Sequence, residues 1–343
     1  MAPAAPGDSR WQQRGAALSA FVRLGRPQFL LGGFLLFGLG SAAAVAVTGS
    51  RFDRLAYAVG QGAITCIQLM THYANDYFDL GADQANTTPT RWSGGSRVLP
   101  GGLVSPHLAL RAARLFGALA ALLVTLIVLM RWGALGDSRD GAAVSSPAVA
   151  ITVVVATVLI LAALLAWFYS APPLTLHSRG LGEATTALVV TGLTPLAGFL
   201  LQVHVDDGWD AARGLGVLGA ALWPLAALQF AMLLAIEFPD AVGDAAVGKR
   251  TLVVRLGGQR AAALYRAVLV AAYGALPLFL VVGAPRPVMV AAGATAPLAA
   301  WQFWRLGRGA WSSAHRWESL AFWAVATLVA TAAFELAAFL WII

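Results

Sequence analysis

The sequence has few charged residues and almost no cysteine. Asp, Glu, Lys and Arg together make up 11% of the 343 residues, and Cys66 is the only cysteine. A single cysteine excludes an internal disulfide. The chain also has no GxxxxGK[ST] motif, which excludes the phosphate-binding loop of P-loop nucleotide-binding proteins. So little charge, with a mean hydropathy of +0.73, does not fit a soluble globular protein.

Long apolar runs take up most of the chain instead. Hydrophobic residues make up 59% of it, and about 20 consecutive apolar residues can cross a bilayer as a helix. We therefore predict an all-α polytopic membrane protein with nine transmembrane helices. The eighth is the weakest, because Pro297 interrupts it. The predicted spans are 28–48, 55–75, 108–130, 149–168, 184–203, 217–236, 263–283, 287–304 and 319–341.

The basic residues indicate how the chain is oriented. If the N-terminus is cytoplasmic, 17 of the 23 Lys and Arg residues fall in inner segments and six in outer segments. Lys and Arg collect on the cytoplasmic side of membrane proteins, so this split supports a cytoplasmic N-terminus and an odd number of spans. The same topology, together with anionic lipid, explains the net charge of +7. We therefore expect the lipid bilayer as a partner, and no nucleic acid.

Residues 1–27 precede the first span and form the first of two predicted regions. Trp11, Leu18 and Phe21 lie there among arginines, a pattern typical of a short helix in the inner membrane interface. A tail without fixed structure is the alternative. The second region, 28–343, is predicted to be one nine-helix transmembrane domain.

A first acidic motif ends the second predicted span. The stretch NDYFDLGAD contains Asn75, Asp76, Asp79 and Asp83. If the helix continues through it, these four side chains fall within an arc of about 100°. His72 points into the same arc, so a polar stripe enters the membrane region. Such stripes normally face the protein interior or a water-filled cavity.

A second acidic motif ends the sixth predicted span. In IEFPDAVGD, the acids Glu237, Asp240 and Asp244 are spaced i, i+3 and i+7, which again places them on one helix face. Mg²⁺ is typically held by a few carboxylates together with phosphate oxygens, so the two motifs predict a diphosphate bound through Mg²⁺. Two solvated helix ends are the alternative. The cations expected to contact the diphosphate directly are Arg91, Arg97, Lys249 and Arg250.

Together the two motifs resemble those of the UbiA-type membrane prenyltransferases. The first is N-D-x-x-D-x-x-x-D, from Asn75 to Asp83, and the resemblance covers nearly the whole chain. Two further stretches, YSAPPLTLHSRGLGE at 169–183 and GKRTLVVRLG at 248–257, are similar to the branch that contains the 1,4-dihydroxy-2-naphthoate prenyltransferases of menaquinone biosynthesis. The loop TRWSGGSRVLPGG, 90–102, departs from many naphthoate enzymes.

This resemblance implies a helical bundle around a central cavity that is capped by inner loops. It also implies a prenyl diphosphate substrate and Mg²⁺ as the cofactor. The metal ligands that it implies are Asn75, Asp76, Asp79, Asp83, Asp240 and Asp244, of which the five acids are the catalytic residues and Asn75 also serves the diphosphate. Residues with a candidate acceptor-binding or accessory role are His72, Tyr169, His177, Arg179, Glu183 and Glu237.

The implied reaction is transfer of a prenyl group to an aromatic acceptor, through ionisation to an allyl cation and electrophilic aromatic substitution. We expect 1,4-dihydroxy-2-naphthoate or a related quinone precursor as the acceptor. The alternatives are 4-hydroxybenzoate, homogentisate, a tetrapyrrole or a glycerol-phosphate lipid. Outside the enzymes, the alternative is a divalent-cation transporter with the acidic stripes as its path. We expect a bacterial or archaeal cell membrane, with the active site facing the cytoplasm.

Overall fold

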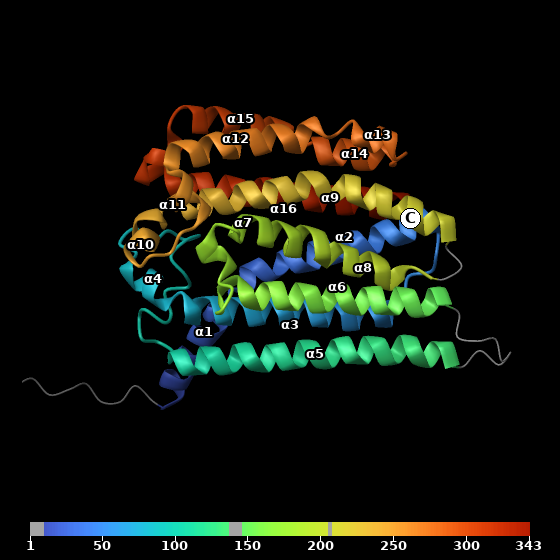
Figure 1. Ribbon diagram of the computed structural model, residues 1–343, viewed down its shortest axis with the longest axis horizontal. Coiled ribbons are helices and arrows are strands. Elements are labelled where there is room, and N and C mark those ends of the chain that lie inside the picture. Colours follow the sequence, from blue (N-terminus) through green and yellow to red (C-terminus); the bar gives the residue numbers. More distant parts are fainter. Residues whose placement is uncertain (1–9, 137–145, 205–207) are drawn as a thin grey trace, which may run out of the picture.

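The computed structural model describes residues 10–136, 146–204 and 208–343, and within these ranges the chain forms helices and no strand. Figure 1 shows the long helices lying side by side in a bundle. The prediction of an all-α membrane fold is therefore confirmed. The long helices are α2 (Pro27–Thr48), α3 (Arg54–Phe78), α5 (Pro106–Gly136), α6 (Ser146–Ser170), α9 (Gly208–Glu237), α12 (Gly258–Gly274) and α16 (Ala314–Ile342).

Shorter helical segments extend or connect these helices. A π-helical segment, η2 (Ala187–Leu193), joins α7 to α8, so the three form one continuous stretch. The other short segments lie between or before the long helices. The short segments are α1 (Arg10–Leu24), α4 (Leu80–Ala85), η1 (Leu176–Arg179), α7 (Gly182–Thr186), α8 (Thr194–Gln202), α10 (Ala241–Ala246), α11 (Leu252–Leu256), α13 (Leu278–Val281), α14 (Arg286–Gly293), α15 (Ala296–Gly307) and η4 (Ala310–Ser312).

Seven helical stretches of the described chain are long and apolar enough to cross a membrane. Two of the nine predicted spans are not among them. The second predicted span is α3, a helix of 25 residues that carries polar side chains at its inner end. The eighth is divided into α14 and α15. All nine predicted segments are helical, and the count of nine spans stays a prediction.

The ends of α3 follow from its local sequence. Before the first turn, the Asp53 carboxylate accepts hydrogen bonds from the backbone N–H groups of Leu55 and Ala56, at 3.0 and 2.9 Å. Such a cap satisfies donors that have no partner within the helix. At the other end Asp79 leaves the helical conformation and connects α3 to α4. The first acidic motif therefore lies at a break between two helices, where its side chains can point in different directions.

Close packing of α2 against α8 depends on glycine. A Cβ atom at Gly40 would lie 1.8 Å from the carbonyl oxygen of Pro195, so the two backbones approach more closely than any larger residue allows. Beside this contact the Ser41 hydroxyl donates to the Phe37 carbonyl at 3.0 Å and lies 3.2 Å from the Gly198 carbonyl. Small residues at such contacts are typical of helix pairs in membranes, where close van der Waals packing stabilises association.

Most polar side chains inside the C-terminal helices have partners. The Gln302 side chain accepts a hydrogen bond from the Tyr265 hydroxyl at 2.9 Å and donates one to Thr327 at 2.9 Å. Glu335 is the exception, because it is fully buried and neither carboxyl oxygen has a partner.

One end of the bundle carries most of the connecting helices. Figure 1 shows α4, α10, α11 and α1 at this end, and the C-terminus at the opposite end. Two buried residues of α1, Ala20 and Leu24, pack in one apolar cluster with Tyr73 of α3. Residues 1–9 of the predicted interfacial segment lie outside the described residues. The connecting helices bring the ends of α3 and α9 together, and with them the two acidic motifs.

The α2–α8 contact can be tested with two glycines of the same helix. We expect Gly40→Ala to destabilise the protein by about 1–3 kcal/mol, because the added methyl group meets a backbone carbonyl that has no room to move. Gly32→Ala is the matched control, since a Cβ atom there meets nothing within 4 Å. Thermal unfolding of both variants in the same detergent measures the difference. Equal stability of the two variants would contradict the contact.

Candidate active site

The first motif comes from the end of α3 and the start of α4. The backbone N–H of Asp79 donates to the backbone carbonyl of Asn75 at 2.8 Å, and the backbone N–H of Asp83 donates to the backbone carbonyl of Asp79 at 2.9 Å. The helical turn is thus kept through the break, but the side chains separate. The Asn75 amide donates to Asp79 at 2.7 Å and to the Ser170 hydroxyl at 2.9 Å, so it holds the Asp79 carboxylate in place.

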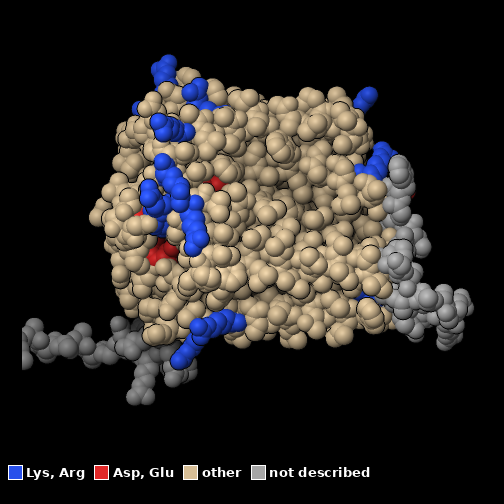
Figure 2. Space-filling view, viewed as in Figure 1, with Lys and Arg blue, Asp and Glu red and all other residues tan. Residues whose placement is uncertain are grey.

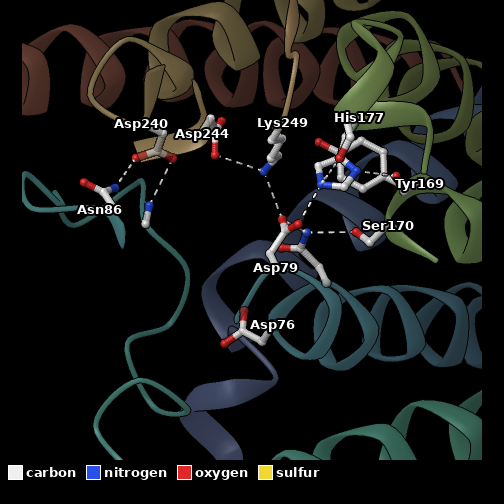
Figure 3. A network of polar contacts seen from close by, with 12 residues as sticks. Asp76, Asp79, Asn86, Tyr169, Ser170, His177, Asp240, Asp244 and Lys249 are labelled. Carbon is white, nitrogen blue, oxygen red and sulfur yellow. Dashed lines mark hydrogen bonds and ion pairs between the residues drawn. The ribbon is translucent and has the colours of Figure 1, made fainter. Parts of the chain in front are cut away.

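Asp76 has different partners from Asp79. It is 1% exposed and forms an ion pair with Arg26, and its other carboxyl oxygen accepts a hydrogen bond from the Ser96 hydroxyl. Figure 3 shows Asp76 apart from the row of side chains that contains Asp79. The single acidic face expected for the first motif is therefore divided. Asp76 lies within α3 and Asp79 at its C-terminal cap, and the two carboxylates reach different partners.

The second motif lies on the end of α9 and on α10, facing the first. The Asp240 carboxylate accepts hydrogen bonds from the Asn86 amide at 2.6 Å and from the backbone N–H of Gly94 at 3.1 Å. Asn86 follows directly after α4, so this contact connects the second motif to the segment that carries the first. Asp244 is buried and points toward Lys249.

Lys249 lies between the two motifs. Its ammonium nitrogen is 3.2 Å from an oxygen of Asp79 and 3.4 Å from an oxygen of Asp244. The ammonium group is mostly buried, which disfavours its charge, but Asp79 and Asp244 raise the pKa of Lys249 above its usual value. Figure 3 shows this lysine as the bridge from α10 to the end of α3. Sequence reasoning placed Lys249 near a phosphate, but it did not predict the bridge.

His177 completes the row on the other side of Asp79. One ring nitrogen, Nδ1, is 2.6 Å from the backbone carbonyl of Tyr169, and the other, Nε2, is 2.7 Å from Asp79. Both ring nitrogens of His177 are thus within hydrogen-bonding distance of an oxygen atom. The ring stacks on that of Tyr169, with the centroids 5.0 Å apart. Asp79 thus contacts both Lys249 and His177.

The carboxylates of the site differ in how well their charges are neutralised. Burial opposes the charge of Asp79, but Lys249 and His177 hold its pKa well below the usual range. Burial raises the pKa of Asp83 to about 7, and the charges of Asp79 and Asp76 add to this effect. Burial and, less strongly, Asp244 raise the pKa of Asp240 to about 6. Such groups gain from a nearby cation.

The loop that follows α4 covers the first motif. At Gly95, where φ is +72°, a Cβ atom would lie 1.9 Å from Asp83 Oδ2, and this oxygen is buried without a hydrogen-bond partner. The Arg97 guanidinium donates to the backbone carbonyl of Asp83. The stretch WSGGS, where the sequence departs from many naphthoate enzymes, therefore lies directly on the acidic site.

Several predicted contacts lie elsewhere. Arg91 is exposed beside Trp92 and lines a pocket with residues of α16. The Arg179 guanidinium donates to the Pro173 carbonyl at 2.9 Å, and Arg250 is exposed. The structure therefore does not bring Arg91, Arg179 or Arg250 into contact with the acidic row.

Other predicted accessory residues are buried near the site. Glu183 on α7 and Glu237 at the end of α9 are both buried and close enough to interact electrostatically. Both Glu183 oxygens and one Glu237 oxygen have no hydrogen-bond partner. The His72 ring lies beside Phe29, with centroids 6.1 Å apart, and its Nε2 is buried without a partner.

Sequence reasoning missed several residues of the site. Arg26 is one of them, because its position before the first predicted span gives no sign of a contact with Asp76. Asn86 and Ser96 belong to the polar run after Asp83, and Ser170 follows Tyr169. The sequence shows that these residues lie near the motifs along the chain, but it does not predict which side chains they contact.

The donor set fits a metal–diphosphate better than a metal alone. Within the described ranges, no group of three His, Cys, Asp or Glu side chains is arranged to hold an ion. Mg²⁺ commonly takes one or two carboxylates and completes its shell with water and substrate phosphate. Asp79 and Asp244 converge on one cation already, and Asp83 Oδ2 has no hydrogen-bond partner. These carboxylates fit such a partial shell.

Comparison with known proteins identifies the family of the chain. The model of the UbiA prenyltransferase family matches residues 34–326. No curated protein matches the chain significantly.

Several solved structures share the fold. Digeranylgeranylglyceryl phosphate synthase is 13% identical, with a TM-score of 0.59 over 94% of this chain and 99% of that chain. A UbiA homologue from Archaeoglobus fulgidus, solved with DMAPP and Mg²⁺, is 14% identical, with a TM-score of 0.58 over 92% and 98%. Another from Aeropyrum pernix K1, without ligand, is 15% identical, with a TM-score of 0.61 over 88% and 96%. At such identities the likeness shows the fold alone.

The lysine bridge can be tested on two neighbouring cations. We expect Lys249→Gln to lower stability by about 3 kcal/mol, because it leaves two buried carboxylates without their shared countercharge. Arg250→Gln removes an equal charge from an exposed position and is the control. Thermal unfolding in detergent measures both. If the two substitutions have the same small effect, the bridge carries no structural role.

Proposed function

The chain belongs to the UbiA prenyltransferase family, and we propose that it transfers a prenyl group from a prenyl diphosphate to an aromatic quinone precursor. Because the chain belongs to this family, it is a membrane-embedded prenyltransferase and therefore an enzyme. The alternative of a divalent-cation transporter is not favoured. The proposal concerns the acceptor, the metal and the roles of single residues. One observation carries it: the acids of α3–α4 and of α9–α10 lie on opposite sides of Lys249 at one end of an apolar bundle.

A polar site at the end of an apolar bundle suits an amphiphilic substrate. A prenyl diphosphate has a strongly anionic head and a hydrocarbon tail, so its head suits the polar site and its tail suits the apolar helices. We propose that Mg²⁺ joins the head to the carboxylates, as the A. fulgidus structure contains DMAPP and Mg²⁺. The proposed metal-binding residues are Asn75, Asp79, Asp83, Asp240 and Asp244.

Asp76 receives a different role in this proposal. Its carboxylate is engaged by Arg26 and Ser96, so it is better suited to hold Arg26 at the site than to bind the metal. Arg26, Lys249 and Arg97 are then the cations available to the diphosphate. Guanidinium and ammonium groups bind phosphate oxygens through charge-assisted hydrogen bonds.

The reaction begins when the bond between the allylic carbon and the diphosphate oxygen breaks. The diphosphate leaves with the electron pair, and the developing negative charge is stabilised by Lys249 and Arg26. Mg²⁺, when bound, would neutralise further charge on the leaving group. A ring carbon of the acceptor then bonds to the allyl cation, and the ring loses a proton or CO₂ to restore aromaticity. We propose that the paired carboxyl groups of Glu183 and Glu237 contact the acceptor hydroxyl groups.

The proposed acceptor is 1,4-dihydroxy-2-naphthoate or a related quinone precursor. Residues 169–183 and 248–257, the two stretches that are similar to the naphthoate enzymes, support this choice. They lie in contact, because the Arg250 backbone N–H donates to the Ser178 carbonyl at 3.1 Å. A Cβ atom at Gly180 would lie 2.7 Å from the Arg255 side chain, so the two stretches pack tightly. One shared surface beside His177 is thus built from both. The alternatives remain 4-hydroxybenzoate, homogentisate, a tetrapyrrole or a glycerol-phosphate lipid.

The proposed setting is a bacterial or archaeal cell membrane with the acidic site facing the cytoplasm. Figure 2 supports it, because Lys and Arg gather at the end of the molecule that carries the acidic motifs, and the middle of the visible face is uncharged. Such a distribution is typical of a cytoplasmic membrane face. We propose that 28–343 form one catalytic domain and that 1–27 lie at the interface.

The acidic row can be tested by removing one negative charge. We expect Asp79→Asn to lower prenyl transfer by roughly a hundredfold or more. The site then loses a carboxylate that holds Mg²⁺, and the leaving diphosphate loses the charge stabilisation of that ion. The control is Asp53→Asn, which keeps a helix cap at the other end of α3. Transfer of radiolabelled prenyl diphosphate in detergent measures both. Full activity of Asp79→Asn, or full activity in excess chelator, would contradict the proposal.

The acceptor can be identified with the same labelled donor. Purified protein with Mg²⁺ is offered the naphthoate, 4-hydroxybenzoate, homogentisate, a tetrapyrrole precursor and a glycerol-phosphate lipid in parallel. We expect the label on the naphthoate, detected by chromatography of the extracted lipids. Label on another acceptor alone would refute the naphthoate while leaving prenyl transfer intact.

A further inference from the structure

A second charged pocket lies outside the acidic site, between the end of α15 and the start of α16. Its volume is about 620 Å³. Trp301, Trp304 and Arg305 line it from α15, Arg308 from the residue after that helix, and His315, Arg316 and Ser319 from α16. No Asp or Glu is among its lining residues, so the pocket is positively charged.

The guanidinium groups of this pocket, those of Arg305, Arg308 and Arg316, have no acidic partner in the described part of the chain, although Arg316 donates from Nε to His315 Nε2 at 3.3 Å. Arg305 donates from Nη2 to the Ser319 hydroxyl at 3.2 Å, but its Nη1 is buried and has no hydrogen-bond acceptor. A buried charged donor without an acceptor is costly, and an anion with several oxygens would satisfy it.

Two tryptophans hold the guanidinium groups in place. Arg305 lies over the Trp301 ring at 4.6 Å from its centroid, and Arg308 over the Trp304 ring at 4.9 Å. Stacking of this kind orients the planar guanidinium, so less freedom is lost when it binds phosphate. Both rings are also partly exposed, at 39% and 54%. Tryptophan is enriched where a protein meets the membrane–water interface.

The position of the pocket indicates a lipid. It lies at the end of α15 and α16 that is shared with the acidic motifs, where basic residues gather (Figure 2). Farther along the same helices and on α14, apolar side chains such as Phe322 and Val290 are exposed, at 46% and 66%. An acyl chain can lie along such a surface while its headgroup occupies the pocket. We propose that this pocket binds the phosphate of an anionic membrane phospholipid.

The chemistry of the pocket distinguishes a phospholipid from the prenyl diphosphate. A diphosphate that arrives with Mg²⁺ needs carboxylate ligands, and the pocket offers none. The carboxylate of Glu318 lines an adjoining hollow with Arg91 and Trp92. A pocket with three guanidinium groups and no carboxylate suits a phosphodiester, which carries a single negative charge and no metal ion. The two exposed tryptophans add apolar contact that inorganic phosphate would not use.

Binding can be measured by native mass spectrometry of the full chain in detergent. We expect retention of phosphatidylglycerol in preference to phosphatidylcholine, and no competition by inorganic phosphate at matched concentration. The triple variant Arg305→Gln, Arg308→Gln, Arg316→Gln should bind phosphatidylglycerol roughly a hundredfold more weakly, since each cation near a membrane surface contributes to attraction of anionic lipid. The exposed single variant Arg308→Gln should show a smaller loss.

Arg286→Gln is the matched control, because it removes one exposed charge from the start of α14. It should bind the lipid as the unaltered protein does. Equal lipid retention by the triple variant, or equal competition by inorganic phosphate, would overturn the proposal. So would loss of prenyl diphosphate binding in the triple variant with phosphatidylglycerol binding intact. Because the readout is lipid retention, the outcome does not depend on which acceptor the enzyme uses.

Discussion

Burial of several carboxylates at the end of an apolar bundle is the constraint on which this structure depends. Each ionised carboxylate taken out of water costs several kcal/mol unless a cation compensates for it. Lys249 meets this requirement for Asp79 and Asp244 together, at 3.2 and 3.4 Å. Arg26 does the same for Asp76, and His177 lies 2.7 Å from an oxygen of Asp79. The short helices at this end serve to deliver these cations to the acids.

The compensation is incomplete, and this has a functional meaning in a prenyltransferase. The elevated pKa values of Asp83 and Asp240 reflect acids that still lack a countercharge. A metal–diphosphate would bring both a cation for these acids and an anion for the cations of the site. The site is thus balanced for a ligand that carries both signs of charge, which agrees with membership of the UbiA family.

The basic pocket of α15 and α16 shows the opposite imbalance at the same end of the molecule. Its guanidinium groups lie on tryptophan rings, and they have no carboxylate partner in the described chain. Acids are absent from this pocket and cations surround the acidic row, so the two regions select different ligands. A plain phosphate ester suits the first, and a metal-bound diphosphate suits the second.

The sequence by itself determined the all-α membrane fold, the two acidic motifs and the family, because hydrophobic run length and motif spacing are local properties of the chain. Tertiary structure alone decided which side chains meet. Asp76 meets Arg26, a residue 50 positions away, and Asp79 meets Lys249, a residue 170 positions away. Arg91 and Arg250 look like Arg97 in the sequence, yet only Arg97 contacts the acidic segment. Such contacts between distant segments depend on how the helices pack against one another, which no local pattern encodes.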